Sequence, residues 1–96
     1  MPDKTGRFSL KVPHGKLVAA RVTFGESVRK VELTGDFFIY PEDGITVMES
    51  ALVGLSASAS EVEMAAAVQS AMDANGIQAV GVDAQSIARV VRGAMK

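Results

Sequence analysis

The sequence contains no cysteine, a single histidine and no long apolar run. The absence of cysteine excludes disulfides, thiolate metal sites and cysteine nucleophiles. Because His14 stands alone, no histidine pair can hold zinc, and a Ser–His–acid triad would depend on a residue in an exposed turn. No segment approaches the roughly 20 apolar residues that span a bilayer, and the N-terminus lacks the apolar core of a signal peptide. We therefore expect a cytoplasmic protein without a metal site or a membrane segment.

Neither charge sign dominates the chain. Ten basic and eleven acidic residues give a formal net charge of -1, so the basic surplus that supports generic nucleic-acid binding is missing. The sequence also lacks the glycine-rich dinucleotide and phosphate-loop motifs. With 96 residues the chain suits one domain, residues 1–96, which buries only about 60–65% of its unfolded surface. We expect a thin core, no deep pocket within this chain alone, and an interface that completes the burial.

The first half of the sequence predicts three strands. Apolar and polar residues alternate over residues 7–12, and again over residues 16–24, with the period of two that is typical of a half-buried strand. A third strand is expected at residues 28–34, with Val31 and Leu33 facing inward. Pro13 and Gly15 interrupt the first pair, and Gly25 lies in a favourable hairpin position. Short connections of this kind predict an antiparallel meander.

The second half predicts helices. Asp43 is expected to cap a helix that runs to about Gly54, and Ser60 with Glu63 forms the pattern of a capping box. Asn75-Gly76 resembles a left-handed helix end, residues 77–82 are expected to add a fourth strand, and Asp83 caps a last helix. The residues expected to face the core are Ile45, Met48 and Leu52; Val62, Ala65, Val68 and Met72; and Ile87, Val90, Val91, Ala94 and Met95.

The pattern predicts an α+β fold, in which helices pack on one face of an antiparallel sheet. The acidic residues of the second half are interpreted as helix caps and solvated helix faces: Glu42, Asp43, Glu49, Glu61 and Glu63. A pair of carboxylates arranged for glycoside hydrolysis has no support beyond spacing. The sequence therefore names no catalytic residue.

Two segments are candidate binding sites. In the first, Lys11 and Lys16 flank a turn that contains Gly15, and lysines in this arrangement could hold a phosphate or a carboxylate as point charges. On the local pattern alone, lysines that keep an exposed hairpin soluble are the simpler interpretation.

The second candidate follows the third strand and carries three of the five aromatic residues of the chain. Gly35 permits a bend, and Asp36 then lies beside aromatic rings, where it must bond its own turn or meet a basic group of a partner. If this segment is extended, Phe37 and Phe38 point to opposite faces, so that one enters the core and the other is available to a partner or ligand. A purely structural role is the simpler local interpretation here too.

These two segments carry a family resemblance. Lys-Val-Pro-His-Gly-Lys-Leu-Val at 11–18, followed by Thr-Gly-Asp-Phe-Phe-Ile-Tyr-Pro-Glu at 34–42, resembles the accessory domain of lipoate–protein ligases, and the likeness extends to residues 49–54 and 80–82. The Gly-Asp-Phe-Phe step is its most specific part, and the helical half is generic. In some bacteria and archaea this domain is a separate small subunit. The chain is similar to that stand-alone form, although His14 replaces a residue that is often smaller in relatives.

The resemblance implies an assistant to an enzyme. In that family the catalytic subunit binds lipoate, ATP and Mg, forms lipoyl-adenylate, and transfers the lipoyl group to a lysine of an acceptor domain. The accessory unit acts mainly in adenylation. This chain lacks the Arg-Arg-x-x-Gly-Gly-Gly segment of the catalytic domain, so the resemblance implies a heterodimer in which the partner holds the cofactors and this chain contacts acceptor domains only indirectly. The residues implied in partner or adenylate contact are Lys11, Gly15, Lys16, Gly35, Asp36, Phe37 and Phe38.

Two other interpretations remain open on the sequence. A regulatory or ligand-binding α+β module that homodimerises through its sheet fits the same order of elements, and it would self-associate without a ligase. A small independent enzyme that uses Asp36 and a lysine is the weakest alternative, because the core is thin and a nucleotide motif is missing. Binding to a catalytic subunit separates the first alternative from the accessory role, and turnover by the isolated chain would support the second.

Overall fold

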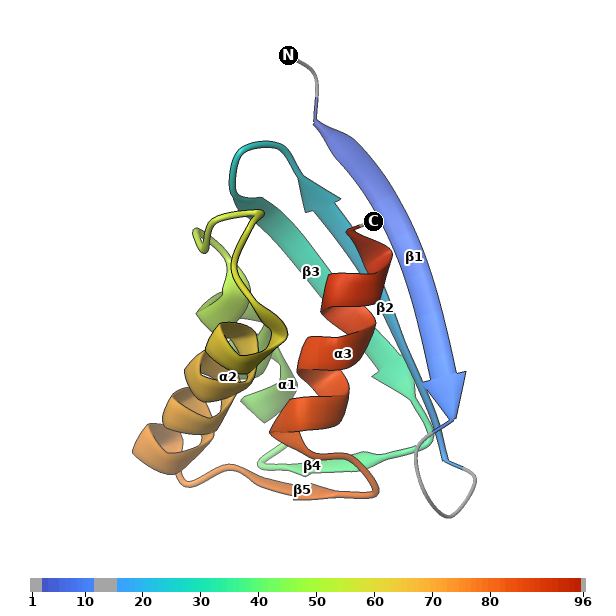
Figure 1. Cartoon of the computed structure of the whole chain (residues 1–96). Helices are drawn as coiled ribbons and strands as arrows, with labels where there is room; N and C mark the ends of the chain where they lie inside the picture. The colour runs from blue at the N-terminus through green and yellow to red at the C-terminus, as the bar shows by residue number, and fades with distance from the viewer. Residues whose placement is uncertain (1–2, 12–15, 96) are drawn as a thin grey trace.

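The computed structural model describes residues 3–11 and 16–95. Eight elements follow one another along these residues, five strands and three helices. They are β1 (Lys4–Lys11), β2 (Leu17–Phe24), β3 (Val28–Gly35), β4 (Phe38–Tyr40), α1 (Gly44–Leu52), α2 (Glu61–Asn75), β5 (Gln78–Val80) and α3 (Ala84–Ala94). Three helices lie on one side of the long strands, while β4 and β5 cross one end of the molecule (Figure 1).

The three long strands form the expected antiparallel meander, with β2 between β1 and β3. Alternation decides which side chains enter the core: Val18, Ala20 and Val22 of β2 are buried, whereas Arg21 between them is exposed. Val31 and Leu33 are buried from β3, as predicted. Helices α1 and α3 pack against the buried side and α2 packs on these two helices, which confirms the α+β class and leaves the opposite face of the sheet uncovered.

Local sequence signals set both ends of α2. The Ser60 hydroxyl accepts the Glu63 amide at 3.1 Å, and the Glu63 carboxylate accepts the Ser60 amide at 3.2 Å, which is the predicted capping box. At the other end, Gly76 adopts left-handed torsions of φ 62° and ψ 33°, and Ile77 donates to the Met72 carbonyl at 2.9 Å. The helix therefore begins and ends where the sequence predicts.

Helix α3 supplies the largest part of the core. The Asp83 carboxylate accepts the Ser86 amide at 2.7 Å and caps its start. The five residues of the predicted stripe are all buried: Ile87, Val90, Val91, Ala94 and Met95. Two glycines permit its close approach to β1, because a Cβ on Gly6 would lie 1.8 Å from the Ala94 carbonyl oxygen and one on Gly93 would lie 2.7 Å from the Phe8 ring.

Three expectations for the helical half are wrong. Asp43 precedes α1 but makes no side-chain cap; its backbone is already helical, with φ -74° and ψ -4°, so the carboxylate is not held in capping geometry. Val62 is 77% exposed, because α2 buries the face that carries Met64, Val68 and Met72. Glu49 does more than face solvent, since its carboxylate accepts the Leu33 amide at 2.7 Å and covers the outer edge of β3.

The strand expected within residues 77–82 is present as β5. It pairs with β4, which the sequence did not predict as a strand, in a two-stranded ribbon separate from the meander. Phe38 lies opposite Val80, and Tyr40 opposite Gln78. Across the two described stretches, no helix is long and apolar enough to cross a membrane.

Candidate functional site

Two exposed regions of the described chain are candidate sites: one gathers exposed apolar side chains, and the other places like charges side by side. The first is the end of the sheet where β3 passes into β4, which carries the residues predicted from the sequence. The second is the uncovered face of the sheet, which sequence reasoning did not single out. We describe these as the end site, formed by Lys16, Leu17, Gly35, Asp36, Phe37 and Phe38, and the open face, formed by the outward residues of β1, β2 and β3.

The two predicted segments meet at the end site. Lys16 immediately precedes β2, and the next residue, Leu17, accepts the Asp36 amide at 2.9 Å through its carbonyl oxygen. The strand register also places Gly35 opposite Val18. The turn at Gly35 and Asp36 is therefore held directly beside Lys16 and Leu17, although the two segments are distant in sequence. Gly15 lies outside the described residues, as does His14.

Gly35 is required at this junction by its backbone geometry. Its φ is 151°, which side chains with a Cβ rarely adopt, and a Cβ there would lie 2.1 Å from the Leu17 carbonyl oxygen. The chain can therefore leave β3 and approach β2 closely only with glycine at this position. The predicted bend at Gly35 is confirmed, and Asp36 is exposed immediately after it.

The neighbouring phenylalanines have opposite environments. Phe37 is half-buried and packs against the core, whereas Phe38 is 63% exposed. Across the ribbon from Phe38, Val80 is 56% exposed, and Tyr40 on the same strand is 55% exposed. Exposed aromatic and aliphatic side chains gathered in this way are typical of protein interaction sites.

Lys11 is the last residue of β1, and Lys16 immediately precedes β2. Both lysines are exposed. Because Lys11 pairs with Leu17, the two lysines lie at the same end of the sheet as Gly35. Their roles in partner or adenylate contact stay predictions, as do those of Asp36, Phe37 and Phe38.

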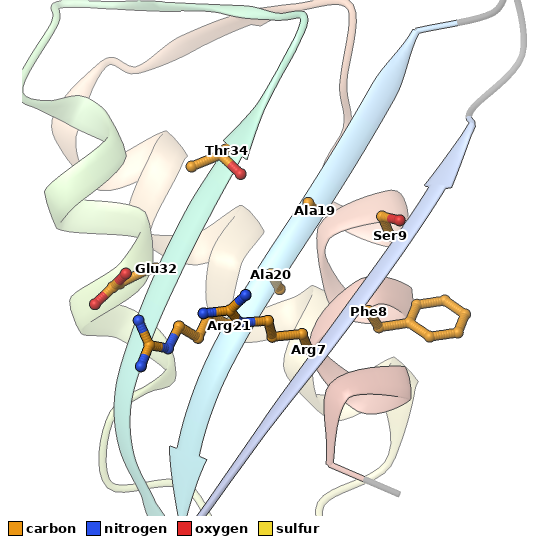
Figure 2. A pocket seen from close by; sticks show the side chains of 8 residues that line it. All are labelled: Arg7, Phe8, Ser9, Ala19, Ala20, Arg21, Glu32 and Thr34. Atoms are coloured by element: carbon orange, nitrogen blue, oxygen red, sulfur yellow. The ribbon is translucent and has the colours of Figure 1, made fainter.

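The open face presents a row of three ionic side chains. Arg7 of β1 lies directly opposite Arg21 of β2, which lies directly opposite Glu32 of β3. Figure 2 shows both guanidinium groups reaching over the sheet toward β3, with the helices behind the strands. Ser9, Ala19 and Thr34 form the next row, and together the two rows line a shallow, open hollow.

The cations around Glu32 lower the pKa of its carboxyl group. A hydrogen bond from Lys30 and the charge of that ammonium group, 3.0 Å away, are the largest effects that lower the pKa of Glu32, and Arg21 and Arg7 lower it further. Glu32 therefore stays ionised as the single carboxylate in its row. The register of the strands creates this arrangement, and the sequence shows only the alternation of polar residues that belongs to it.

The described residues contain neither clustered metal ligands nor an enclosed hollow on the open face. Among residues 3–11 and 16–95, no group of three His, Cys, Asp or Glu side chains is placed to hold a metal ion. The hollow over Arg7 and Arg21 is open rather than enclosed.

Comparison with known proteins adds a fold relationship. No protein-family model and no curated protein sequence matches the chain. A solved structure from Thermoplasma acidophilum is similar, with a TM-score of 0.68 and 21% sequence identity over 94% of each chain. It comes from an archaeal lipoylation system, a bipartite lipoate protein ligase and its E2 lipoyl domain. The chain thus shares its fold, over nearly its whole length, with a component of a lipoate ligase system.

Proposed function

We propose that this chain is the accessory subunit of a two-component lipoate–protein ligase and acts with a catalytic subunit in ATP-dependent formation of lipoyl-adenylate. The observation that carries the proposal is the coincidence of two independent likenesses. The fold is similar to that of a component of an archaeal lipoate ligase system over 94% of both chains, and the most family-like sequence step, Gly35 to Phe38, forms a structurally constrained end site.

The physical role follows from the chemistry of adenylation. An anionic carboxylate must approach the α-phosphate of ATP, so charge has to be neutralised and water excluded. The partner would bind lipoate, ATP and Mg, because this chain presents open surfaces. The end site would dock at the mouth of that active site, with Phe38 packed on the partner and Lys16 beside the phosphates or the loops that hold them.

The test is a reconstituted lipoylation assay with the catalytic subunit, in the presence and absence of this chain. Pyrophosphate release reports adenylation, and transfer from supplied lipoyl-adenylate reports the second step. We expect the chain to be needed for the first step and largely dispensable for the second. A catalytic subunit that adenylates equally well alone, or adenylation by the isolated 96-residue chain, would overturn the proposal.

Matched variants locate the contact. Lys16→Ala should reduce adenylation more than transfer, whereas Lys4→Ala, which removes an exposed lysine at the opposite end of the sheet, should change neither. Phe38→Ser should weaken binding to the catalytic subunit, and Val62→Ser serves as its control, because Val62 is also exposed but lies on α2. Equal effects of a variant and its control would remove the end site from the mechanism. Self-association without ligase binding would favour the homodimeric module instead.

A further inference from the structure

The open face has a net positive charge, although the chain as a whole has a net negative charge. By strand alternation, the ionic side chains of the open face are Arg7, Lys11, Arg21, Lys30 and Glu32. Four cations and one anion give this face a charge of +3 on a chain whose net charge is -1. The rest of the chain therefore carries a net negative charge, whereas the face that no helix covers carries a net positive one.

The arginine pair carries an electrostatic repulsion, and Glu32 opposite Arg21 supplies one compensating negative charge. Like charges directly opposite each other on neighbouring strands destabilise a sheet, and Arg7 and Arg21 occupy such a pair. Within the described stretches, Asp3, Glu32 and Glu61 form close ion pairs with Arg29, Lys30 and Arg89, and none does so with Arg7 or Arg21. Two neighbouring guanidinium groups match two neighbouring carboxylates, with fork-like donors suited to both.

We propose that the open face docks an acidic surface of another protein, whose carboxylates meet Arg7 and Arg21. Ser9 and Thr34 flank the arginines with hydroxyl groups, and Ala19 leaves room between them for an incoming side chain. The arginine row is separate from the end site, which the open face adjoins at Leu17, and the inference does not depend on the lipoylation role.

The geometry favours a protein over a small anion or a nucleic acid. A small ligand needs a concave site that buries most of its surface, and this hollow is open. A nucleic acid presents negative charge everywhere and would place some of it against Glu32. A protein surface can instead set carboxylates over the arginines and a neutral or basic group over Glu32, which makes the alternating charges a basis for specificity.

The dimensions predict weak, salt-sensitive binding. An eight-residue strand spans about 26 Å and three strands cover about 14 Å, so the face offers roughly 360 Å². That is less than half of the about 800 Å² that each partner contributes to a standard interface. We therefore expect an association that weakens steeply with ionic strength, because exposed charges are screened within about 10 Å at 0.1 M salt.

The experiment is a nuclear magnetic resonance titration of the full chain with three probes: an oligoglutamate peptide, an oligothymidine of matched charge, and inorganic phosphate. We expect the peptide to shift the Arg7 and Arg21 side-chain signals and the Ser9 and Thr34 amides, and to bind more tightly than the other two probes. Absent or dispersed shifts, tighter binding of the oligonucleotide, or equal binding of phosphate would each overturn the proposal.

Charge-matched variants complete the test. Arg7→Glu with Arg21→Glu should weaken peptide binding by about tenfold or more, because like charges then face each other across the contact. Arg29→Glu with Arg89→Glu changes the net charge equally but leaves the Arg7–Arg21–Glu32 row unchanged, and it should retain binding. The neutral pair Arg7→Gln with Arg21→Gln guards against misfolding and should also lose binding. Equal losses in the test and control pairs would show that only net charge matters and would refute the assignment. Failure of the ligase assay alone would leave this result unaffected.

Discussion

Replacement of Gly35 by alanine tests whether the end site is as constrained as its geometry indicates. A backbone conformation that only glycine adopts readily costs other residues about 1–3 kcal/mol. At Gly35, with φ 151°, the added Cβ would also lie 2.1 Å from the Leu17 carbonyl oxygen, so the strand and the turn must separate. That separation removes the 2.9 Å hydrogen bond from the Asp36 amide, a net loss of about 0.5–1.5 kcal/mol. We therefore expect a total destabilisation of about 2–4 kcal/mol.

Gly76→Ala is the control because it has the strain without the close contact. Gly76 is also left-handed, with φ 62°, but a Cβ there meets no atom within 4 Å. Its cost should be about 1–2 kcal/mol, the usual penalty of the left-handed helical conformation. The difference between the two variants isolates the approach of Gly35 to β2.

Urea unfolding and thermal melting measure both variants. For a domain of this length, each kcal/mol shifts the melting temperature by about 4–8 °C, so a loss of about 2–4 kcal/mol in Gly35→Ala should lower it by roughly 8–32 °C. If Gly35→Ala were no more destabilising than Gly76→Ala, the close approach of the two segments would be wrong, and with it the proximity of Lys16 to Asp36.

Three further predictions concern other contacts. Arg92 donates to the carbonyl oxygens of Ala57 and Ala59 at 2.6 and 3.0 Å, so Arg92→Met should cost about 1.5–3 kcal/mol in urea unfolding. Arg92→Lys should recover only part of that loss, and full recovery would mean that charge alone suffices. Leu52 is completely buried, so Leu52→Ala should cost about 2–5 kcal/mol, while the exposed neighbour Val53→Ala should stay within about 0.5 kcal/mol; similar losses would contradict the packing. Because Lys30 is the largest cause of the lowered pKa of Glu32, Lys30→Gln should raise that pKa toward its usual value of 4.5 in a carboxyl titration followed by magnetic resonance. A group whose folded-state pKa is lowered stabilises the fold above its unfolded pKa, so the contribution of Glu32 is lost as the pH falls through its lowered value, and an unchanged pKa in the variant would rule out Lys30 as the cause.

Features encoded by neighbouring residues were predictable from the sequence, and features that depend on distant packing were not. The capping box at Ser60, the helix end at Gly76 and the buried stripe of α3 each depend on residues within a few turns of one another. Val62 shows the limit, because the expected stripe and the observed one share Val68 and Met72, and only packing against α1 and α3 selects between them. For the same reason, the sequence indicated a strand near residue 79 but not its partner, β4.

The candidate sites divide in the same way. The sequence singled out Gly35, Phe37 and Phe38 because a glycine beside clustered aromatics is an unusual local pattern, and the structure confirms the bend and the contrast between the two rings. Arg7 and Arg21 attracted no notice, since each is an ordinary polar residue on an alternating strand. The two arginines become neighbours only through the register of β1 and β2, which local sequence patterns do not reveal.

The small size of the domain explains why both candidate sites are surfaces. The buried apolar side chains of the described residues form one core, in which α1 and α3 cover one face of the three-stranded sheet and α2 packs on these two helices. The other face then has no apolar layer above it and must carry polar side chains, so its chemistry is free to vary without cost to the core. The β4–β5 ribbon likewise has one side packed on the core and the other side exposed. Phe38 lies on the exposed side, where contact with another molecule would bury it. The open face is basic and the end site is aromatic. A single partner that covered both would therefore need an acidic patch and an apolar patch, set at the angle between the sheet and its end. This is a stricter requirement than either surface makes alone.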